Sequence, residues 1–178
     1  MNVRRIVTGH SKTGASVFMS DGLPPGAAIF EHVPGMEVAL AWKSAADGLI
    51  ARSGDEPTSP GSVVPAVGET ALLVVTFPPD SVRTAPTFDR AAAGAESKKF
   101  LPGLAESFEP DAPGMHTTET VDYGILLEGE LTLELDGGAS KRLNLHDIVI
   151  QNGTRHAWRN TSDRPATMLF VLIGGHRG

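Results

Sequence analysis

Runs in which apolar and polar residues alternate dominate the second half of the chain. Residues 124–127, 130–135 and 143–150 contain such runs, and residues 166–173 form a longer apolar segment. A period of two is typical of strands that bury one face. The turns between these segments have the length of hairpin loops, so we expect neighbouring strands to be antiparallel. The pattern predicts an antiparallel barrel or jelly roll.

The first part of the chain adds strands to this barrel. Short apolar runs predict strands at residues 3–7, 15–19, 27–33 and 37–42. We expect the first two to form a hairpin, and the other two to extend one sheet of the barrel or to lie across a partner subunit. Residues 45–66 are rich in Gly, Ser, Pro, Asp and Ala, which predicts a loop.

A short helical insert is predicted before the most polar part of the barrel. Residues 91–100 mix Ala, Glu and Lys and predict a helix, and residues 104–108 predict a second, shorter one. Phe100, Leu104 and Phe108 recur at helical spacing, so we expect them to pack on the barrel mouth. The predicted fold class is therefore all-β, with N-terminal strand additions and a short helical insert.

Length, composition and charge limit the number of domains and the kinds of partner that we expect. The chain of 178 residues suits one domain, in which residues 1–66 supply the N-terminal strands and the loop and residues 67–178 the barrel. The absence of cysteine excludes disulfides and thiolate metal sites. A net charge of -6 gives no sign of a nucleic-acid partner. No secretory signal or membrane-length apolar run is visible, so a cytoplasmic location is expected.

The face that begins at His116 carries side chains that can do chemistry. Residues two apart share a face of a strand, so we expect His116, Thr118, Thr120 and Asp122 to point the same way. Gly124 continues this face, and glycine inside a strand often marks where a ligand or another backbone comes close. The face therefore offers an imidazole, hydroxyls and a carboxylate before it becomes small and apolar.

A second histidine lies on a later predicted strand. Asn152-Gly153 is a turn signal, and His156 and Trp158 share a face of the strand that follows. Burying two imidazoles and a carboxylate together is costly unless they are paired or bind a metal ion. His116, Asp122 and His156 are therefore either metal ligands or a buried hydrogen-bonded cluster.

These spacings resemble the two motifs of the cupin superfamily. The matching positions are His116, Asp122 and Gly129 in the first motif and Gly153, His156 and Asn160 in the second. The resemblance covers the C-terminal half well and the region from Gly68 onwards more loosely. It implies a jelly-roll barrel and, because many cupins dimerise through sheet extension, a homodimer.

The chain departs from the family pattern at several positions. Thr118 replaces the second histidine of the first motif, Asp122 replaces its glutamate, and His146 and Gln151 replace an expected glycine and proline. The resemblance then implies a metal site of His116, Asp122 and His156, which resembles the facial triad that suits non-haem Fe(II). Zinc, nickel or manganese would also be possible.

Several functions remain open on this pattern. The first is an O2-dependent oxidoreductase of the dioxygenase type that acts on a small molecule, and the second is a metal-assisted lyase or isomerase. The third is a non-catalytic barrel that binds a small metabolite without metal. The residues expected to line the substrate pocket are Thr118, Gly124, Gln151 and Trp158.

Three arginines lie near the motifs and could bind a substrate carboxylate. They are Arg83, Arg155 and Arg159. Alternation directs Arg155 and Arg159 away from His156, so we expect both to lie on the surface.

Overall fold

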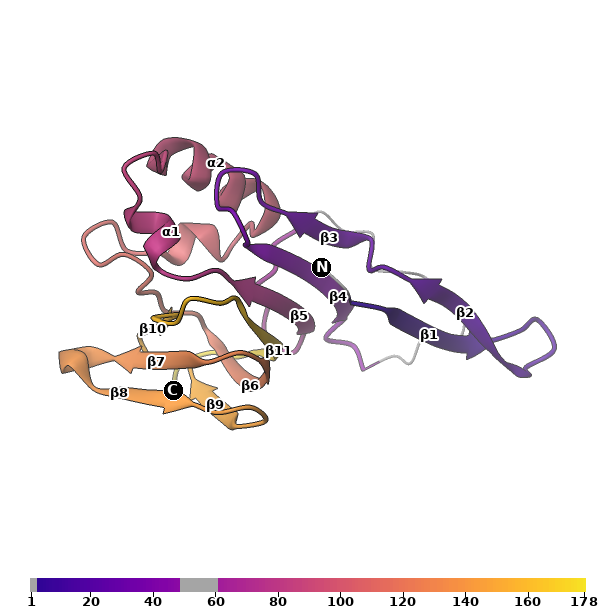
Figure 1. The fold of residues 1–178 in the computed structure, drawn as a ribbon. Coiled ribbons are helices and arrows are strands. Elements are labelled where there is room, and N and C mark those ends of the chain that lie inside the picture. Colours follow the sequence, from indigo (N-terminus) through magenta and orange to yellow (C-terminus); the bar gives the residue numbers. More distant parts are fainter. Residues whose placement is uncertain (1–2, 49–60) are drawn as a thin grey trace.

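The structure is a computed structural model that describes residues 3–48 and 61–178, and within these ranges antiparallel strands form three sheets. The main sheet has the order β3-β4-β5-β11-β6-β9. Its strands are β3 (Gly26–Ile29), β4 (Glu37–Ser44), β5 (Thr70–Phe77), β11 (Ala166–Gly174), β6 (Thr120–Glu128) and β9 (Ile148–Asn152). The second sheet has the order β10-β7-β8, with strands β10 (His156–Arg159), β7 (Leu131–Leu135) and β8 (Ser140–Leu143). The predicted all-β antiparallel class is confirmed (Figure 1).

The N-terminal strands divide between two places. β1 (Arg5–His10) and β2 (Ser16–Gly22) form the predicted hairpin, which projects away from the rest of the molecule (Figure 1). β3 and β4 lengthen the main sheet through pairing of β4 with β5. Most of the loop predicted at residues 45–66 lies outside the described residues.

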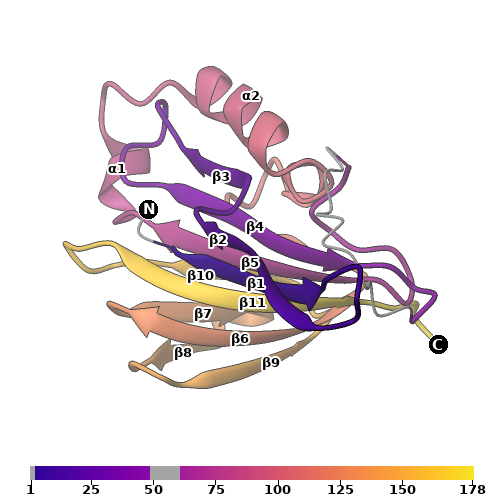
Figure 2. The ribbon, with the colours of Figure 1, turned by 90° about the vertical axis from the view of Figure 1, so that its right-hand side faces the viewer.

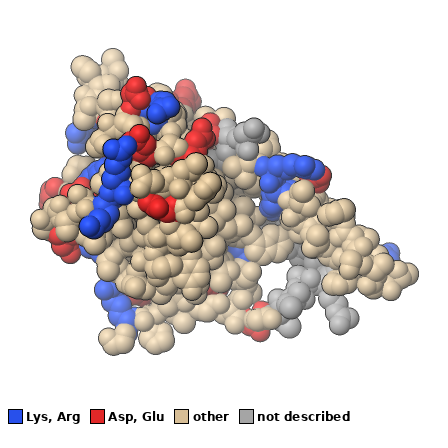
Figure 3. All heavy atoms as spheres, turned by 60° about the horizontal axis from the view of Figure 1, so that its bottom comes forward, with Lys and Arg blue, Asp and Glu red and all other residues tan. Residues whose placement is uncertain are grey.

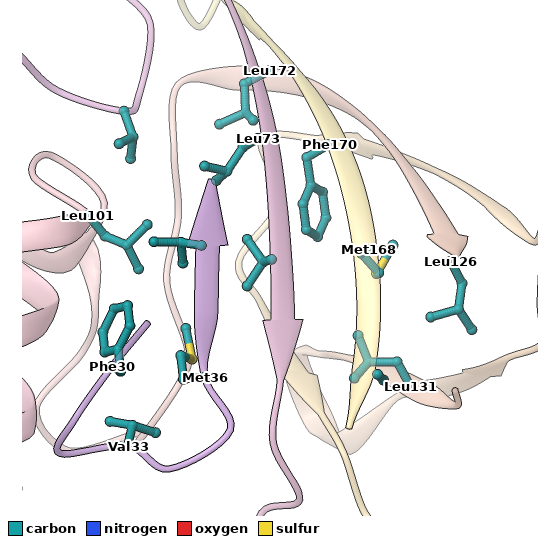
Figure 4. Packing of buried hydrophobic residues seen from close by; sticks show 14 of the residues in the cluster. Phe30, Val33, Met36, Leu73, Leu101, Leu126, Leu131, Met168, Phe170 and Leu172 are labelled. Atoms are coloured by element: carbon teal, nitrogen blue, oxygen red, sulfur yellow. The ribbon is translucent and has the colours of Figure 1, made fainter. Parts of the chain in front are cut away.

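The core follows from the alternation read in the sequence. Along β11, Ala166, Met168, Phe170 and Leu172 are buried and point inward. They meet Leu126 of β6 and other apolar side chains of both sheets (Figure 4). Full burial of one such side chain contributes about 1.5–3 kcal/mol to folding, so these positions hold the sheets at a fixed separation.

The helical insert differs in detail from the prediction. The predicted first helix is α2 (Arg90–Phe100), which begins where the Asp89 side chain accepts hydrogen bonds from two backbone N–H groups. It lies beside β3 and β4 (Figure 2). The second predicted helix is only a 3₁₀ turn at Ala105–Ser107, and α1 (Ser81–Thr84) was not predicted. Within the described residues, no helix combines the length and the apolar character that a membrane crossing requires.

The first-motif strand starts later than the sequence predicts. β6 begins at Thr120, whereas His116 is held by isolated bridges to Phe108 and His156. The reason is that the chain changes sheets here: His116 pairs with the first residue of β10, and Thr120 pairs with Gly174 of β11. The predicted alternation is still present. The side chains on the predicted face are all buried, whereas Glu119 between them is exposed; the buried ones are His116, Thr118, Thr120 and Asp122.

The turn before β9 provides a test of backbone strain. His146 occupies the position where the family pattern expects glycine, and its φ of 69° lies in the left-handed region. This conformation costs a residue with a Cβ about 1 kcal/mol. His146→Gly should therefore be about 1 kcal/mol more stable than His146→Ala in urea unfolding, since both remove the imidazole and only one removes the Cβ. Equal stabilities of the two variants would contradict the strain.

Candidate functional site

A cavity of about 730 Å³ lies between the inner face of the main sheet and the helical insert. This volume suits a small organic molecule. Most of its wall is apolar, with contributions from Leu73 of the sheet, from Met36 just before β4 and from Leu101 after α2 (Figure 4). A few polar side chains converge on one part of the wall, among them those of His116, Asp122 and His156.

The two motif histidines lie against each other. Each backbone N–H donates to the other residue's carbonyl oxygen over 3.0 Å, which forms an antiparallel bridge between His116 and His156. Side chains of directly opposed residues project to the same side of such a pair. The ring centroids are accordingly 4.2 Å apart. Two histidines 40 positions apart in the sequence thus form one donor pair.

A turn before each histidine fixes its ring. Met115 N–H donates to Ala112 O across Pro113-Gly114, and Gly114 has a φ of 82°. Proline followed by a residue of positive φ is the signature of a type II turn. A Cβ on Gly114 would also lie 2.9 Å from an Arg159 nitrogen. The Asn152-Gly153 turn, with a φ of 56° at Gly153, plays the same part before His156.

Hydrogen bonds assign the ring nitrogens. His116 Nδ1 lies 3.1 Å from Gly114 O, and His156 Nδ1 lies 2.9 Å from Thr154 O. Because a carbonyl only accepts, each Nδ1 carries the proton, and Nε2 keeps its lone pair when the ring is neutral. Burial lowers the pKa of His116, and burial together with the neighbouring His116 lowers the pKa of His156 to about 4. Both rings are therefore neutral near pH 7 and present one nitrogen donor each.

Asp122 is a buried carboxyl with an unsatisfied oxygen. Its side chain lines the same cavity, and within the described part of the chain its Oδ1 is buried without a hydrogen-bond partner. Burial raises the pKa of Asp122 to about 6, which a hydrogen bond from Thr120 partly opposes. A buried carboxylate without a partner is costly, so this group favours either a proton or a nearby cation.

The three predicted metal ligands do not converge on one point in this structure. Among residues 3–48 and 61–178, no three His, Asp or Glu side chains converge closely enough to hold a metal ion between them. The structure brings His116 and His156 into contact and leaves Asp122 on the wall of the same cavity. The donor chemistry of the two neutral imidazoles and the unpaired carboxyl nevertheless fits a divalent metal.

Two of the four predicted pocket residues line the cavity. Thr118 is buried there, and its hydroxyl lies 2.8 Å from that of Thr120. The Trp158 ring meets His156 edge-on at 5.7 Å and forms part of the wall.

The other two pocket predictions need correction. The Gln151 side chain is buried but turns away from the cavity, because its amide nitrogen donates to Thr154 O over 3.1 Å. Gly124 faces the core: a Cβ there would lie 3.0 Å from Met168 Cε and 3.2 Å from a Phe170 ring carbon. Its missing side chain makes room for these two residues rather than for a ligand.

Ion pairs hold the segments around the histidines. Arg155 donates two hydrogen bonds of 2.6 Å to Glu109, and Arg159 donates one of 2.5 Å to Glu134. Both arginines are partly exposed, as predicted, although Arg159 also lines the cavity. The Arg155 guanidinium lowers the pKa of Glu109. The Glu109–Arg155 pair ties the chain before His116 to the residue that precedes β10, and the Arg159–Glu134 pair joins β10 to β7.

Sequence reasoning missed two structural contributions to the site. Phe108 was expected on the barrel mouth but packs directly on the His116 ring, with centroids 4.8 Å apart. Asn160, the last motif position, is fully buried, and its amide nitrogen donates to Phe77 O and Arg164 O. Only the motif spacing signals Asn160, and nothing local in the sequence signals the Phe108 contact, since it depends on the pairing of Phe108 with His116.

Comparison with known proteins identifies related sequences for the part of the chain that holds the site. Residues 106–172 match the family model described as Cupin domain. Phomopsin biosynthesis cluster protein D of Diaporthe leptostromiformis is 47% identical over 80 residues, which are 42% of this chain and 42% of that protein. Cupin-domain-containing oxidoreductase virC of Hypocrea virens is 37% identical over 62 residues, which are 33% of this chain and 32% of that protein.

These alignments are partial. In these two pairs the chain spans 42% and 32% of the length of the relative it matches. Among solved structures, a Cupin 2 conserved barrel domain protein from Salinispora arenicola aligns with a TM-score of 0.41 and 14% identity, over 82% of this chain and 86% of that chain.

The raised pKa of Asp122 makes a prediction about stability. The folded carboxyl has a pKa of about 6, and the unfolded one a pKa of about 4. Between these values the folded state binds the proton more tightly, so wild-type stability falls as the pH rises through this range. Asp122→Asn removes this loss. In urea unfolding with a chelator present, its stability relative to wild type should therefore be about 2–3 kcal/mol more favourable at pH 7.5 than at pH 4.

The control for this measurement is Asp163→Asn, whose side chain is 95% exposed. It should show no difference from wild type that depends on pH. Titration of the two histidines occurs in every variant and cancels in the comparison. A constant offset between Asp122→Asn and wild type at all pH values would contradict the raised pKa.

Proposed function

We propose that this chain, whose residues 106–172 match the Cupin domain model, is a cupin oxidoreductase that acts on a small molecule beside His116 and His156. The observation that carries the proposal is the pair of neutral imidazoles, each fixed through Nδ1 and each left with a lone pair on Nε2. Metal-binding histidines are oriented in this way, by a carbonyl that accepts from the other ring nitrogen. The oxidoreductase class is supported by the names of relatives such as virC.

The proposed cofactor is one divalent metal ion, with Fe(II) favoured and zinc, nickel or manganese as alternatives. His116 and His156 would be its nitrogen ligands, and Asp122 would supply the carboxylate that offsets its charge. The unsatisfied Oδ1 of Asp122 supports this role, because a cation nearby would compensate a carboxylate that otherwise lies buried and unpaired. When bound, Fe(II) with two histidines and one carboxylate supplies O2 chemistry of the dioxygenase type.

Residues around the histidine pair shield it from water and can position a small-molecule substrate. Phe108 and Trp158 pack on the two histidine rings and exclude water from them. Thr118 offers a hydroxyl that can bind a substrate oxygen from the same wall. Glu109 and Arg155 keep the His116 segment against β10 through their ion pair.

Two observations favour other functions for the same cavity. A carboxyl with a pKa of about 6 is about one-tenth protonated at pH 7 and so can both take up and release a proton near neutral pH, which suits Asp122 for proton transfer in a lyase or isomerase. The lack of three converging ligand side chains in the described ranges favours a metal-free barrel that binds a metabolite.

Metal content separates these functions when it is measured with matched histidine variants. Protein purified anaerobically without chelator and loaded with Fe(II) should hold close to one equivalent of metal. His116→Ala and His156→Ala should each lose most of it, because each removes one of two nitrogen donors. His32→Ala, at an exposed histidine of the β3–β4 loop, should bind as wild type does.

Oxygen consumption with enols, catechols and diketones then tests the reaction class. Uptake by the loaded wild type that is lost in both histidine variants would support the oxidoreductase. Bound metal without uptake would move the function to the lyase or isomerase. Equal metal content in wild type, both variants and the control would contradict the site.

We propose further that the chain acts as a homodimer. Within the described residues, Phe18 of the projecting hairpin is 77% exposed, and Tyr123, Ile148 and Ile150 form an exposed apolar stretch on the outer side of β6 and β9. Figure 3 shows that the projecting part of the surface is largely uncharged beyond a group of basic side chains at its base. Apolar surface of this kind is typical of an interface.

Light scattering with size-exclusion chromatography tests the dimer. Wild type should elute as a dimer, and Phe18→Ser should weaken association about tenfold or more, because the loss of one buried aromatic anchor costs at least about 2 kcal/mol. Val67→Ser, which also replaces an exposed apolar residue, should remain dimeric. A monomeric wild type would contradict the proposal.

A further inference from the structure

The cavity extends along an aromatic wall that begins at the histidine pair. Trp158 follows His156 at 5.7 Å between ring centroids, Phe170 follows Trp158 at 5.5 Å, and Phe77 follows Phe170 at 6.5 Å. All of these rings line the cavity. An apolar surface therefore connects the polar donors at one end with the segment after β5 at the other.

Hydrogen bonds of Asn160 hold the segment after β5 and the start of α1 at that other end. Asn160, at the end of β10, donates from its amide to Phe77 O over 3.0 Å and accepts from Asp80 N–H at its backbone carbonyl over 2.8 Å. The short helix α1, which carries Arg83, starts at once after Asp80. Extended backbone rises about 3.3 Å per residue, so the four steps from His156 place the backbone of Asn160, to which Asp80 is hydrogen-bonded, about 13 Å along the chain from His156.

Arg83 lines the cavity at this end with its charge uncompensated by an ion pair. In the part of the chain that the structure describes, its guanidinium forms no ion pair, and the one side-chain hydrogen bond goes to Met36 Sδ at 3.6 Å. Thioether sulfur is a weak acceptor, so most of the guanidinium donors remain available. The Arg83 side chain is exposed to solvent at the rim of the cavity, although nearby protein atoms lower its pKa and the charge of Asp80 opposes this. At neutral pH the group stays cationic.

Apart from Asp80, the other charges at this end of the cavity are either held in ion pairs or positive like Arg83. Arg159 is bound to Glu134, and Glu109 is bound to Arg155. Arg90 and Lys98 of α2 line the same cavity and add positive charge. Asp80 is the nearby acid, and among the ion pairs of the described residues none joins it to Arg83. The α1 end of the cavity therefore favours an anion.

We propose that the cavity takes an elongated, largely apolar substrate with a carboxylate at one end, which Arg83 binds while the other end lies at His116 and His156. The inference rests on the proposed function in one respect, since it takes the histidine pair as the reacting end. Arginine suits this role because its planar guanidinium can donate two parallel hydrogen bonds to one carboxylate. The aromatic wall accounts for the apolar body, and its length sets the separation of the two ends.

Calorimetric titration with a matched pair of probes tests the inference. The probes are 6-phenylhexanoate and the uncharged 6-phenylhexanamide, which share an apolar body of suitable length. Wild type should bind the carboxylate about tenfold more tightly than the amide, as expected for a charge-assisted, two-pronged hydrogen bond from the guanidinium. Arg83→Gln should abolish this preference and leave the affinity for the amide unchanged. Arg83→Lys, which keeps the charge but not the fork, should retain part of it.

The controls separate Arg83 from general charge effects. Arg142→Gln, at an exposed arginine paired with Glu130, removes the same charge and should keep the tenfold preference. Unchanged amide binding by Arg83→Gln shows that the cavity is intact in that variant. The inference is overturned if wild type shows no preference, if it binds neither probe, or if Arg83→Gln keeps the preference while Arg90→Gln or Lys98→Gln loses it. None of these readouts involves metal or turnover, so failure here is distinct from failure of the oxidoreductase proposal.

Discussion

The backbone bridge between His116 and His156 is the interaction on which the site depends. It joins the chain just before the main sheet to the first residue of β10 in the second sheet, and so it links the two sheets at the point where both imidazoles enter the cavity. Since these hydrogen bonds are formed by the backbone, they keep the two residues opposite each other whatever the side chains do, and the ring centroids lie 4.2 Å apart. The turns at Gly114 and Gly153 then supply the carbonyl-bearing segments that fix each Nδ1. The donor pair is thus set by the fold before any ligand binds, which is the condition for a preorganised site.

The electrostatics of the cavity follow from the same burial. Removing water from two imidazoles and a carboxyl favours the neutral form of each group, which lowers the pKa values of the histidines and raises that of Asp122. Burial of Asp122 lowers the stability of the folded protein, because its Oδ1 has no hydrogen-bond partner among the described residues. A site that is less stable than an apolar core would be is typical of places where function has constrained the sequence. Arg83 places a positive charge at the other end of the cavity, opposite in sign to an ionised Asp122. The cavity is therefore polar at its two ends and apolar between them.

Much of this arrangement could be predicted because it depends on local periodicity. Alternation predicted that His116, Thr118, Thr120 and Asp122 share a buried face, and motif spacing related His116 to His156. The predictions that failed depend on contacts between distant segments. The late start of β6 follows from the change of sheet after His116, the turned Gln151 amide follows from its bond to Thr154, and the role of Gly124 follows from the bulk of Met168 and Phe170. The identity of the metal and the place of Asp122 among its ligands remain predictions, since sequence and fold supply the donors but not the ion.

The most direct test of the account is the ligand environment of a metal bound by the intact chain. X-ray absorption spectroscopy on protein loaded with one equivalent of Zn²⁺, as a redox-inert reporter, measures the number of imidazole ligands and their distances. The account predicts two histidine nitrogens at about 2.0–2.1 Å, reduced to one in His156→Ala. A spectrum with only oxygen ligands and no imidazole scattering, unchanged in His156→Ala, would contradict the claim that the paired histidines form the metal site.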